Sequence, residues 1–155
     1  MKKKTYLFIG IIIILLIIMF VWLYSSPGFN GDILAVNLKE HINLAMHIHP
    51  YLEIEILGKN QAIPTNIGIS NSGMRTIHTH DNTGKIHLES PYPYKFHMKD
   101  FFSVWGKTFN SSCIFEYCTD EKHELLFFVN DVQNSEYENL ALNDGDKIKI
   151  VYKEK

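Results

Sequence analysis

The sequence predicts an α+β fold in which an N-terminal transmembrane helix precedes a β-grasp-like sheet with one short packed helix and a histidine-rich inserted hairpin. Three observations predict it. An apolar run opens the chain, segments of alternating apolar and polar residues flank one segment with helical spacing, and histidines gather around a turn in the middle. A β-sandwich is the alternative, and the helical segment disfavours it.

The apolar run covers residues 6–24, follows three lysines, and is followed by no charge until Asp32. At ~1.5 Å per helical residue it could cross a hydrocarbon core of ~30 Å, whereas the apolar region of a signal peptide spans about 7 to 15 residues. We therefore expect an uncleaved signal-anchor, with the lipid bilayer as the partner of residues 6–24. The lysines place the N-terminus in the cytoplasm and the C-terminal domain outside, as a single-pass protein of the cell membrane. A cleaved signal peptide is the alternative.

The sequence divides into three predicted parts. Residues 1–24 are the cytoplasmic lysine flank and anchor, residues 25–45 a juxtamembrane linker with Pro27 and Gly28 near its start, and residues 46–155 an extracytoplasmic α+β domain. Beyond the lysine flank, twelve basic residues stand against seventeen acidic ones, a balance of −5 with neutral histidines. Nucleic acid is therefore not an expected partner.

The strands are predicted from alternation. Residues 47–57 alternate between apolar and polar side chains, and a turn at residues 58–61 leads to a second extended segment at residues 62–69. Two later strands are expected at residues 123–131 and 147–152. The chain therefore opens with a hairpin and closes with strands.

The helix is predicted from a different spacing. Met98, Phe101, Phe102 and Trp105 stand at i, i+3, i+4 and i+7, and Gly106 is a natural stop. We expect this aromatic face to pack on the sheet as core.

The histidines fall into three units of the form His-x-His or His-x-Glu. These units are His47 with His49, His78 with His80, and His87 with Glu89. Alternate residues of a strand share a face about 6 to 7 Å apart, and an Asp-Asn-Thr-Gly turn joins the second unit to the third. We therefore predict a metal site in which imidazoles from separate strands converge.

The predicted ligands are the histidines of these units, with two acidic residues holding the imidazoles in place. The ligands are His47, His49, His78, His80 and His87, and the supporting residues are Asp81 and Glu89. Copper is slightly favoured over zinc, because the intrinsic order of divalent ions favours it and because Met46, Met74 and Met98 add sulfur nearby. In the alternative without metal, Asp81 caps the turn and the histidines form hydrogen bonds between strands.

Three functions fit the pattern. The first is a membrane-anchored extracytoplasmic metal-binding module, either a carrier or an accessory subunit that contacts other subunits of a larger membrane complex. The second is a metal-dependent enzyme with histidine ligands, an open water position, and Glu89 or Asp81 as base. The third is a purely structural membrane-complex subunit without metal. The chain has no HExxH, GxSxG or P-loop motif, which favours binding over catalysis.

Two cysteines, Cys113 and Cys118, lie five positions apart. On one straight strand they would point in opposite directions, so a disulfide requires a turn between them. Free thiols and soft-metal ligation are the alternatives.

Residues 47–106 resemble an uncharacterised family of small membrane-anchored or secreted domains. The shared signature runs HIH, IPxNIGI, HTHDxTGxIHxE and DFFxVWG, and this chain matches it at residues 47–49, 63–69, 78–89 and 100–106. The resemblance implies no named activity. The chain has Met74 ahead of the HTHD element, where the family has cysteine or methionine, and His97 before DFF, where a threonine is expected.

Overall fold

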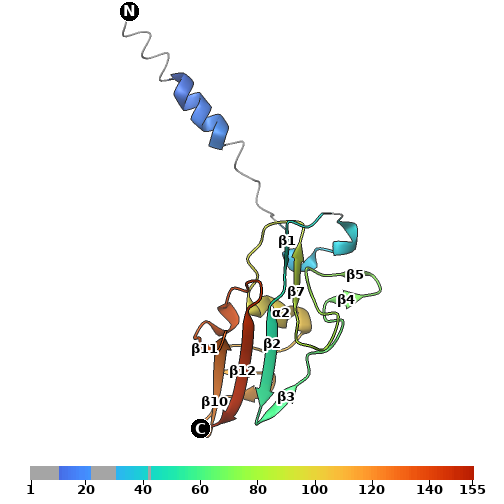
Figure 1. The fold of residues 1–155 in the computed structure, drawn as a ribbon, viewed down its shortest axis with the longest axis vertical. Coiled ribbons are helices and arrows are strands. Elements are labelled where there is room, and N and C mark those ends of the chain that lie inside the picture. Colours follow the sequence, from blue (N-terminus) through green and yellow to red (C-terminus); the bar gives the residue numbers. More distant parts are fainter. Residues whose placement is uncertain (1–10, 22–30, 42) are drawn as a thin grey trace, which may run out of the picture. The chain divides into compact units, whose positions relative to one another are not determined.

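The computed structural model describes residues 11–21, 31–41 and 43–155. The chain separates into two units, Met1–Gly31 and Asp32–Lys155. Residues 11–21 of the first unit are helical. The second unit holds the sheets, the short helices and the histidines (Figure 1).

The predicted transmembrane helix is wrong for the part of the chain that the structure describes. Among these residues, no helix has the length and apolar character needed to cross a membrane. The helical residues described there, 11–21, account for about 16 Å at ~1.5 Å per residue, about half of a ~30 Å hydrocarbon core. The predicted fold class and the predicted single-pass location in the cell membrane are corrected accordingly. Residues 6–10 and 22–24 of the predicted anchor lie outside the described residues.

The main sheet of the second unit has five strands in the order β11-β10-β12-β2-β3. Its strands are β2 (Tyr51–Ile56), β3 (Lys59–Gln61), β10 (His123–Val129), β11 (Val132–Gln133) and β12 (Lys147–Glu154). β12 runs parallel to β2, and the other neighbours are antiparallel. Figure 1 shows β12 and β2 side by side in the middle. The first strand of the β2–β3 hairpin therefore pairs in parallel with the last strand of the chain, in a unit that contains both helix and sheet.

One face of this sheet forms the core together with a helix. Alternate residues of the central strands are buried, including Ile54 of β2 and Ile150 of β12. Helix α2 (Met98–Trp105) buries Met98, Phe101 and Phe102 and ends at Gly106, whose φ is 70°. The helix therefore occupies the predicted residues, and three residues of its predicted face are core, whereas Trp105 is only half-buried.

A second sheet of three short strands carries the histidines. Its strands, β1 (Met46–Ile48), β7 (His87–Ser90) and β6 (Ile77–His78), pair in that order and are antiparallel. The predicted single strand at residues 47–57 is therefore two strands in two sheets. The break falls at His49 and Pro50, where the amide of His49 donates to Asp144 Oδ1 at 2.8 Å and Pro50 has no N–H to donate.

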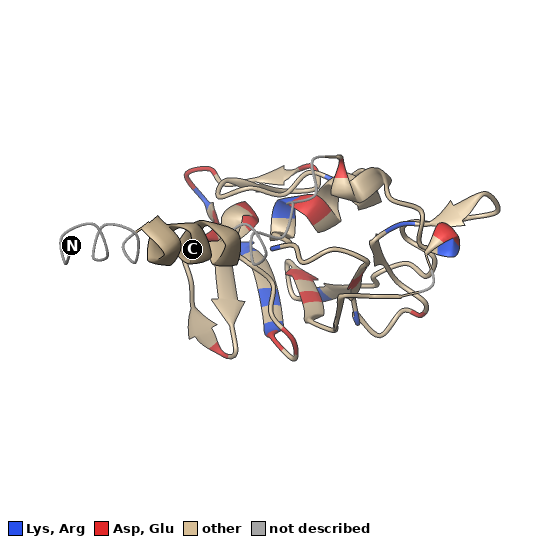
Figure 2. Ribbon diagram, turned by 90° about the horizontal axis from the view of Figure 1, so that it is seen from above, with Lys and Arg blue, Asp and Glu red and all other residues tan. Residues whose placement is uncertain are grey.

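The remaining elements are short. They are the 3-10 helices η1 (Ile33–Ala35), η2 (Leu38–Glu40) and η3 (Tyr137–Asn139) and the hairpins β4 (Ile69–Ser70) with β5 (Gly73–Met74) and β8 (Cys113–Ile114) with β9 (Tyr117–Cys118). Ile33 and Leu38, in the segment predicted as linker, are buried. Segments bearing positive and negative side chains are mixed over the second unit (Figure 2).

The two cysteines form a disulfide. Cys113 and Cys118 face each other across the β8–β9 hairpin, and their sulfur atoms are bonded. The turn that the bridge requires includes Phe115, which has a φ of 55°. Both thiols are therefore used in the disulfide, which leaves neither for soft-metal ligation.

Candidate metal centre

The three-stranded sheet brings all five predicted histidines together. His47 lies opposite Glu89, and His78 lies opposite His87 in the strand register. Their neighbours Ile48, Leu88 and Ile77 alternate with them, and Leu88 and Ile77 are fully buried. One face of the sheet therefore packs into the core, and the other gathers the imidazoles. We call His47, His49, His78, His80 and His87 the histidine cluster.

The cluster contains two groups of three ligand-type nitrogens. His47, His49 and His87 form one group, and His78, His80 and His87 form the other. Within each group the nitrogens lie within 4.8 Å of one another. Because metal–nitrogen bonds are ~2 Å long, nitrogens held this close can reach a common ion after small side-chain movements.

His78 is the most buried member of the cluster. Its side chain is 0% exposed, and its Nδ1 lies 3.0 Å from the carbonyl oxygen of Arg75. A carbonyl only accepts, so Nδ1 carries the proton. Burial lowers the pKa of His78 to about 4, although Glu89 and the Arg75 carbonyl act in the opposite direction. The ring is therefore neutral at pH 7, and its Nε2 presents a lone pair towards His80 Nε2 at 3.2 Å.

His87 lies at the centre of the cluster, on the middle strand β7. Its ring centre is 4.5 Å from that of His49, 4.6 Å from that of His80 and 5.2 Å from that of His78. Burial lowers the pKa of His87, and the imidazoles of His49 and His80 lower it further. Its Nδ1 is buried and makes no well-formed hydrogen bond among the described residues, although Glu89 Oε1 lies 3.5 Å away.

Glu89 places one carboxylate oxygen among the imidazoles. Its Oε1 lies 3.1 Å from His47 Nε2, 3.7 Å from His78 Nε2 and 3.5 Å from His87 Nδ1. The Glu89 side chain is only 12% exposed. A largely buried carboxylate in this position provides negative charge that would partly offset the charge of a bound cation.

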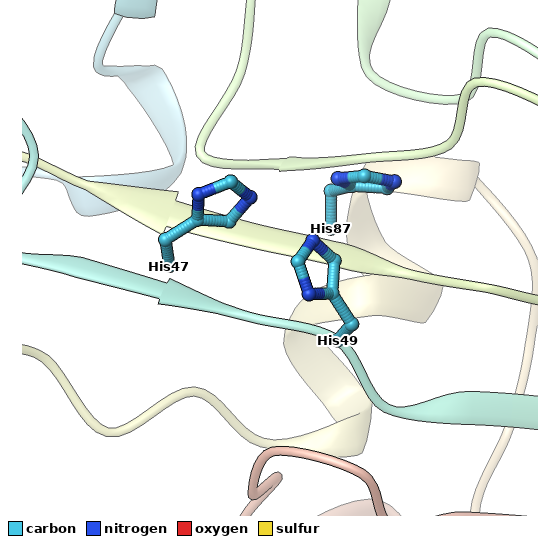
Figure 3. A group of neighbouring side chains, drawn as sticks. All are labelled: His47, His49 and His87. Atoms are coloured by element: carbon cyan, nitrogen blue, oxygen red, sulfur yellow. The ribbon is translucent and has the colours of Figure 1, made fainter.

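The group of His47, His49 and His87 is more open to solvent than the group that contains the buried His78. The His47 side chain is 48% exposed, against 17% for His87. Figure 3 shows His47 and His49, from the end of β1, gathered with His87 from β7 on the same side of the sheet. The ring centres of His47 and His49 lie 4.5 Å apart. An ion could therefore approach this group from outside.

Asp81 does not contact the cluster in the way that Glu89 does. Its Oδ1 accepts hydrogen bonds from the amide of Thr83, at 2.9 Å, and from the Thr83 hydroxyl. These bonds, with the hydroxyl contributing most, lower the pKa of Asp81. Asp81 therefore caps the turn that joins His80 to His87, as the alternative without metal predicts for this residue.

Met98 and the three remaining histidines lie outside the cluster. Met98 is fully buried in the helix core, so its sulfur belongs to the hydrophobic packing. The histidines outside the cluster have partners elsewhere, because His123 contacts Asp120, His97 contacts Asp100 and His41 contacts Tyr92. The carbonyl of Arg75, which orients His78, was not predicted because a backbone acceptor leaves no signal in residue type.

Comparison with family models, curated proteins and solved structures gives no match to this chain. The family resemblance of residues 47–106 therefore stays a prediction.

Proposed function

We propose that this protein is a metal-binding module that takes Cu(II) or Zn(II) in the histidine cluster. One observation carries the proposal: the nitrogens of His78, His80 and His87 lie within 4.8 Å of one another. The most buried of the three, His78, has its Nδ1 on the Arg75 carbonyl, which leaves Nε2 free to act as a ligand. Ligating histidines typically donate their other ring N–H to a carbonyl or carboxylate, as His78 does.

Electrostatics support the same proposal. Metal ligands must be unprotonated, and the lowered pKa values of His78 and His87 keep both rings neutral at pH 7. The histidine cluster places five imidazoles in one region, more than the four positions of one tetrahedral ion. The Glu89 carboxylate then supplies charge for the ion.

Imidazole nitrogen suits both copper and zinc, and the intrinsic affinity order places Cu(II) first. Methionine sulfur would favour Cu(I), but Met98 is fully buried in the core and its sulfur packs there. We therefore propose a divalent ion bound by nitrogen.

The contacts of the acidic residues favour binding over catalysis. Glu89 lies within 3.7 Å of three imidazole nitrogens, and Asp81 is bonded to Thr83 within its own turn. A general base must reach a substrate proton, and both carboxylates have other partners.

The test is elemental analysis of the full chain, purified without a histidine tag and equilibrated with Zn(II) or Cu(II). The variant His78→Ala/His80→Ala removes two cluster imidazoles, and His41→Ala/His123→Ala is the matched control that removes two others. We expect stoichiometric metal in the wild type and the control, and a loss of at least half in the cluster variant. Equal metal in all three proteins, with circular dichroism showing that each is folded, would refute the proposal.

A further inference from the structure

The two groups of the histidine cluster share one residue. His87 belongs to the group with His47 and His49 and to the group with His78 and His80. It is on the middle strand of the three-stranded sheet, with His47 of β1 on one side and His78 of β6 on the other. His49 and His80 follow just after these two strands. An imidazole has two ring nitrogens, and each can bind a different ion once both are unprotonated.

The ring separations fit ligation in both groups. With a ~2 Å bond to each nitrogen, two imidazoles on one ion have ring centres about 4.5 to 5.5 Å apart for bond angles near 90–110°. We call His78, His80 and His87 the inner group. Its ring centres are separated by 4.8 Å (His78 to His80), 5.2 Å (His78 to His87) and 4.6 Å (His80 to His87). In the outer group, His47, His49 and His87, two separations are 4.5 Å. The third, between His47 and His87, is 6.1 Å, so the exposed His47 ring must move closer for all three to bind one ion.

One ion cannot use all five rings, because tetrahedral or square-planar geometry offers four positions. A single ion in either group would leave two histidines of the other group without a role in binding. Glu89 Oε1 lies within reach of both groups, at 3.1 Å from His47 Nε2 and 3.7 Å from His78 Nε2. The buried Nδ1 of His87 lies 3.5 Å from Glu89 Oε1, too far for a well-formed hydrogen bond, so an ion can take this nitrogen.

We propose that the cluster binds two divalent ions, one in each group, with the imidazole of His87 bridging them. The inference rests on the proposed function and adds its stoichiometry. Binding the second ion releases the remaining ring N–H proton of His87 to solvent, so that the ring bridges as an imidazolate. Two dications then face two negative groups, the His87 ring and the Glu89 carboxylate.

The test is a Cu(II) titration of the full chain, followed by bound copper per chain and by electron paramagnetic resonance. We expect two ions per chain. The resonance intensity should rise with the first equivalent and fall by more than half as the second binds, because a bridging imidazolate couples the two unpaired spins.

Two variants locate the sites. His47→Ala/His49→Ala removes only the outer pair, so the stoichiometry should fall from two ions to one, with a full signal from the uncoupled ion. His41→Ala/His123→Ala should keep two coupled ions. The outer pair is partly exposed, so its removal leaves the buried core intact.

Saturation of the wild type at one ion would overturn the bridged pair and leave the proposed function standing. Two ions whose signals simply add would also overturn it, because the ions would then share no ligand. A wild-type chain that binds no copper would overturn both proposals.

Discussion

The close approach of Gly84 to strand β2 predicts a large effect of a small substitution. Gly84 ends the turn between His80 and His87, and its carbonyl accepts a hydrogen bond from the Leu52 amide at 2.8 Å. Its φ is +85°, and an added Cβ would lie 2.3 Å from the Leu52 carbonyl oxygen. That distance is about 1 Å shorter than the ~3.5 Å at which non-bonded atoms pack well.

We therefore expect Gly84→Ala to lower the free energy of unfolding by about 3 kcal/mol. About 1 kcal/mol comes from a left-handed backbone with a Cβ, and about 2 kcal/mol from the clash with a backbone atom that cannot rotate away. With a urea m-value of about 1–3 kcal/mol/M, the midpoint of unfolding should fall by about 1–3 M.

The matched control is Gly58→Ala. Gly58 has a similar φ of +75°, but an added Cβ meets nothing within 4 Å. This variant should lose only the backbone contribution, about 1 kcal/mol. If urea denaturation followed by circular dichroism gave the two variants equal midpoints, the close packing of the turn against β2 would be disproved.

Three further predictions concern the core, the pH dependence and the disulfide. Leu88→Ala, at a fully buried position behind the cluster, should cost about 2–5 kcal/mol in urea denaturation; a cost below 1 kcal/mol would show that this face is not packed. Burial lowers the pKa of His78 from 6.5 to about 4, so below pH 6.5 the unfolded chain binds a proton that the folded chain does not. The stability of the metal-free protein should therefore be complete above pH 6.5 and fall with the pH towards 4, with about 2 kcal/mol lost at pH 5; a His78→Gln variant that keeps the full pH dependence would refute this assignment. The double variant Cys113→Ser/Cys118→Ser should lose about 2 kcal/mol of stability, as expected for a short closed loop. In thermal unfolding, a reductant should lower the midpoint temperature of the wild type and leave that of this variant unchanged.

The sequence predicts local features of the site well, because they depend on alternation along one strand. Glu89 and His87 share a face simply because Leu88 lies between them, and the same holds for His78 and His80. The structure brings the five imidazoles together, and their role as ligands stays a prediction. The sequence does not determine the role of Asp81, because an aspartate can either support a metal ligand or cap a turn. The hydrogen bond from the Thr83 amide distinguishes the two roles.

Features that depend on distant residues were harder to predict. The strand at residues 47–57 divides at Pro50 because Asp144, far along the chain, accepts from the His49 amide. Alternation alone cannot reveal a change of sheet. The predicted membrane helix came from counting apolar residues, and no helix among the described residues has the length and apolar character needed to cross a membrane.

The central claim is that a metal ion is held by imidazoles that meet at His87, and its most direct test is the dissociation constant for Zn(II). Isothermal titration calorimetry of the tag-free full chain should be compared with His87→Ala and with His123→Ala as control. We predict that His87→Ala weakens binding by more than the 10–100-fold that loss of a ligand's hydrogen-bond partner typically costs, while His123→Ala binds like the wild type. Equal affinity in all three proteins would contradict the account.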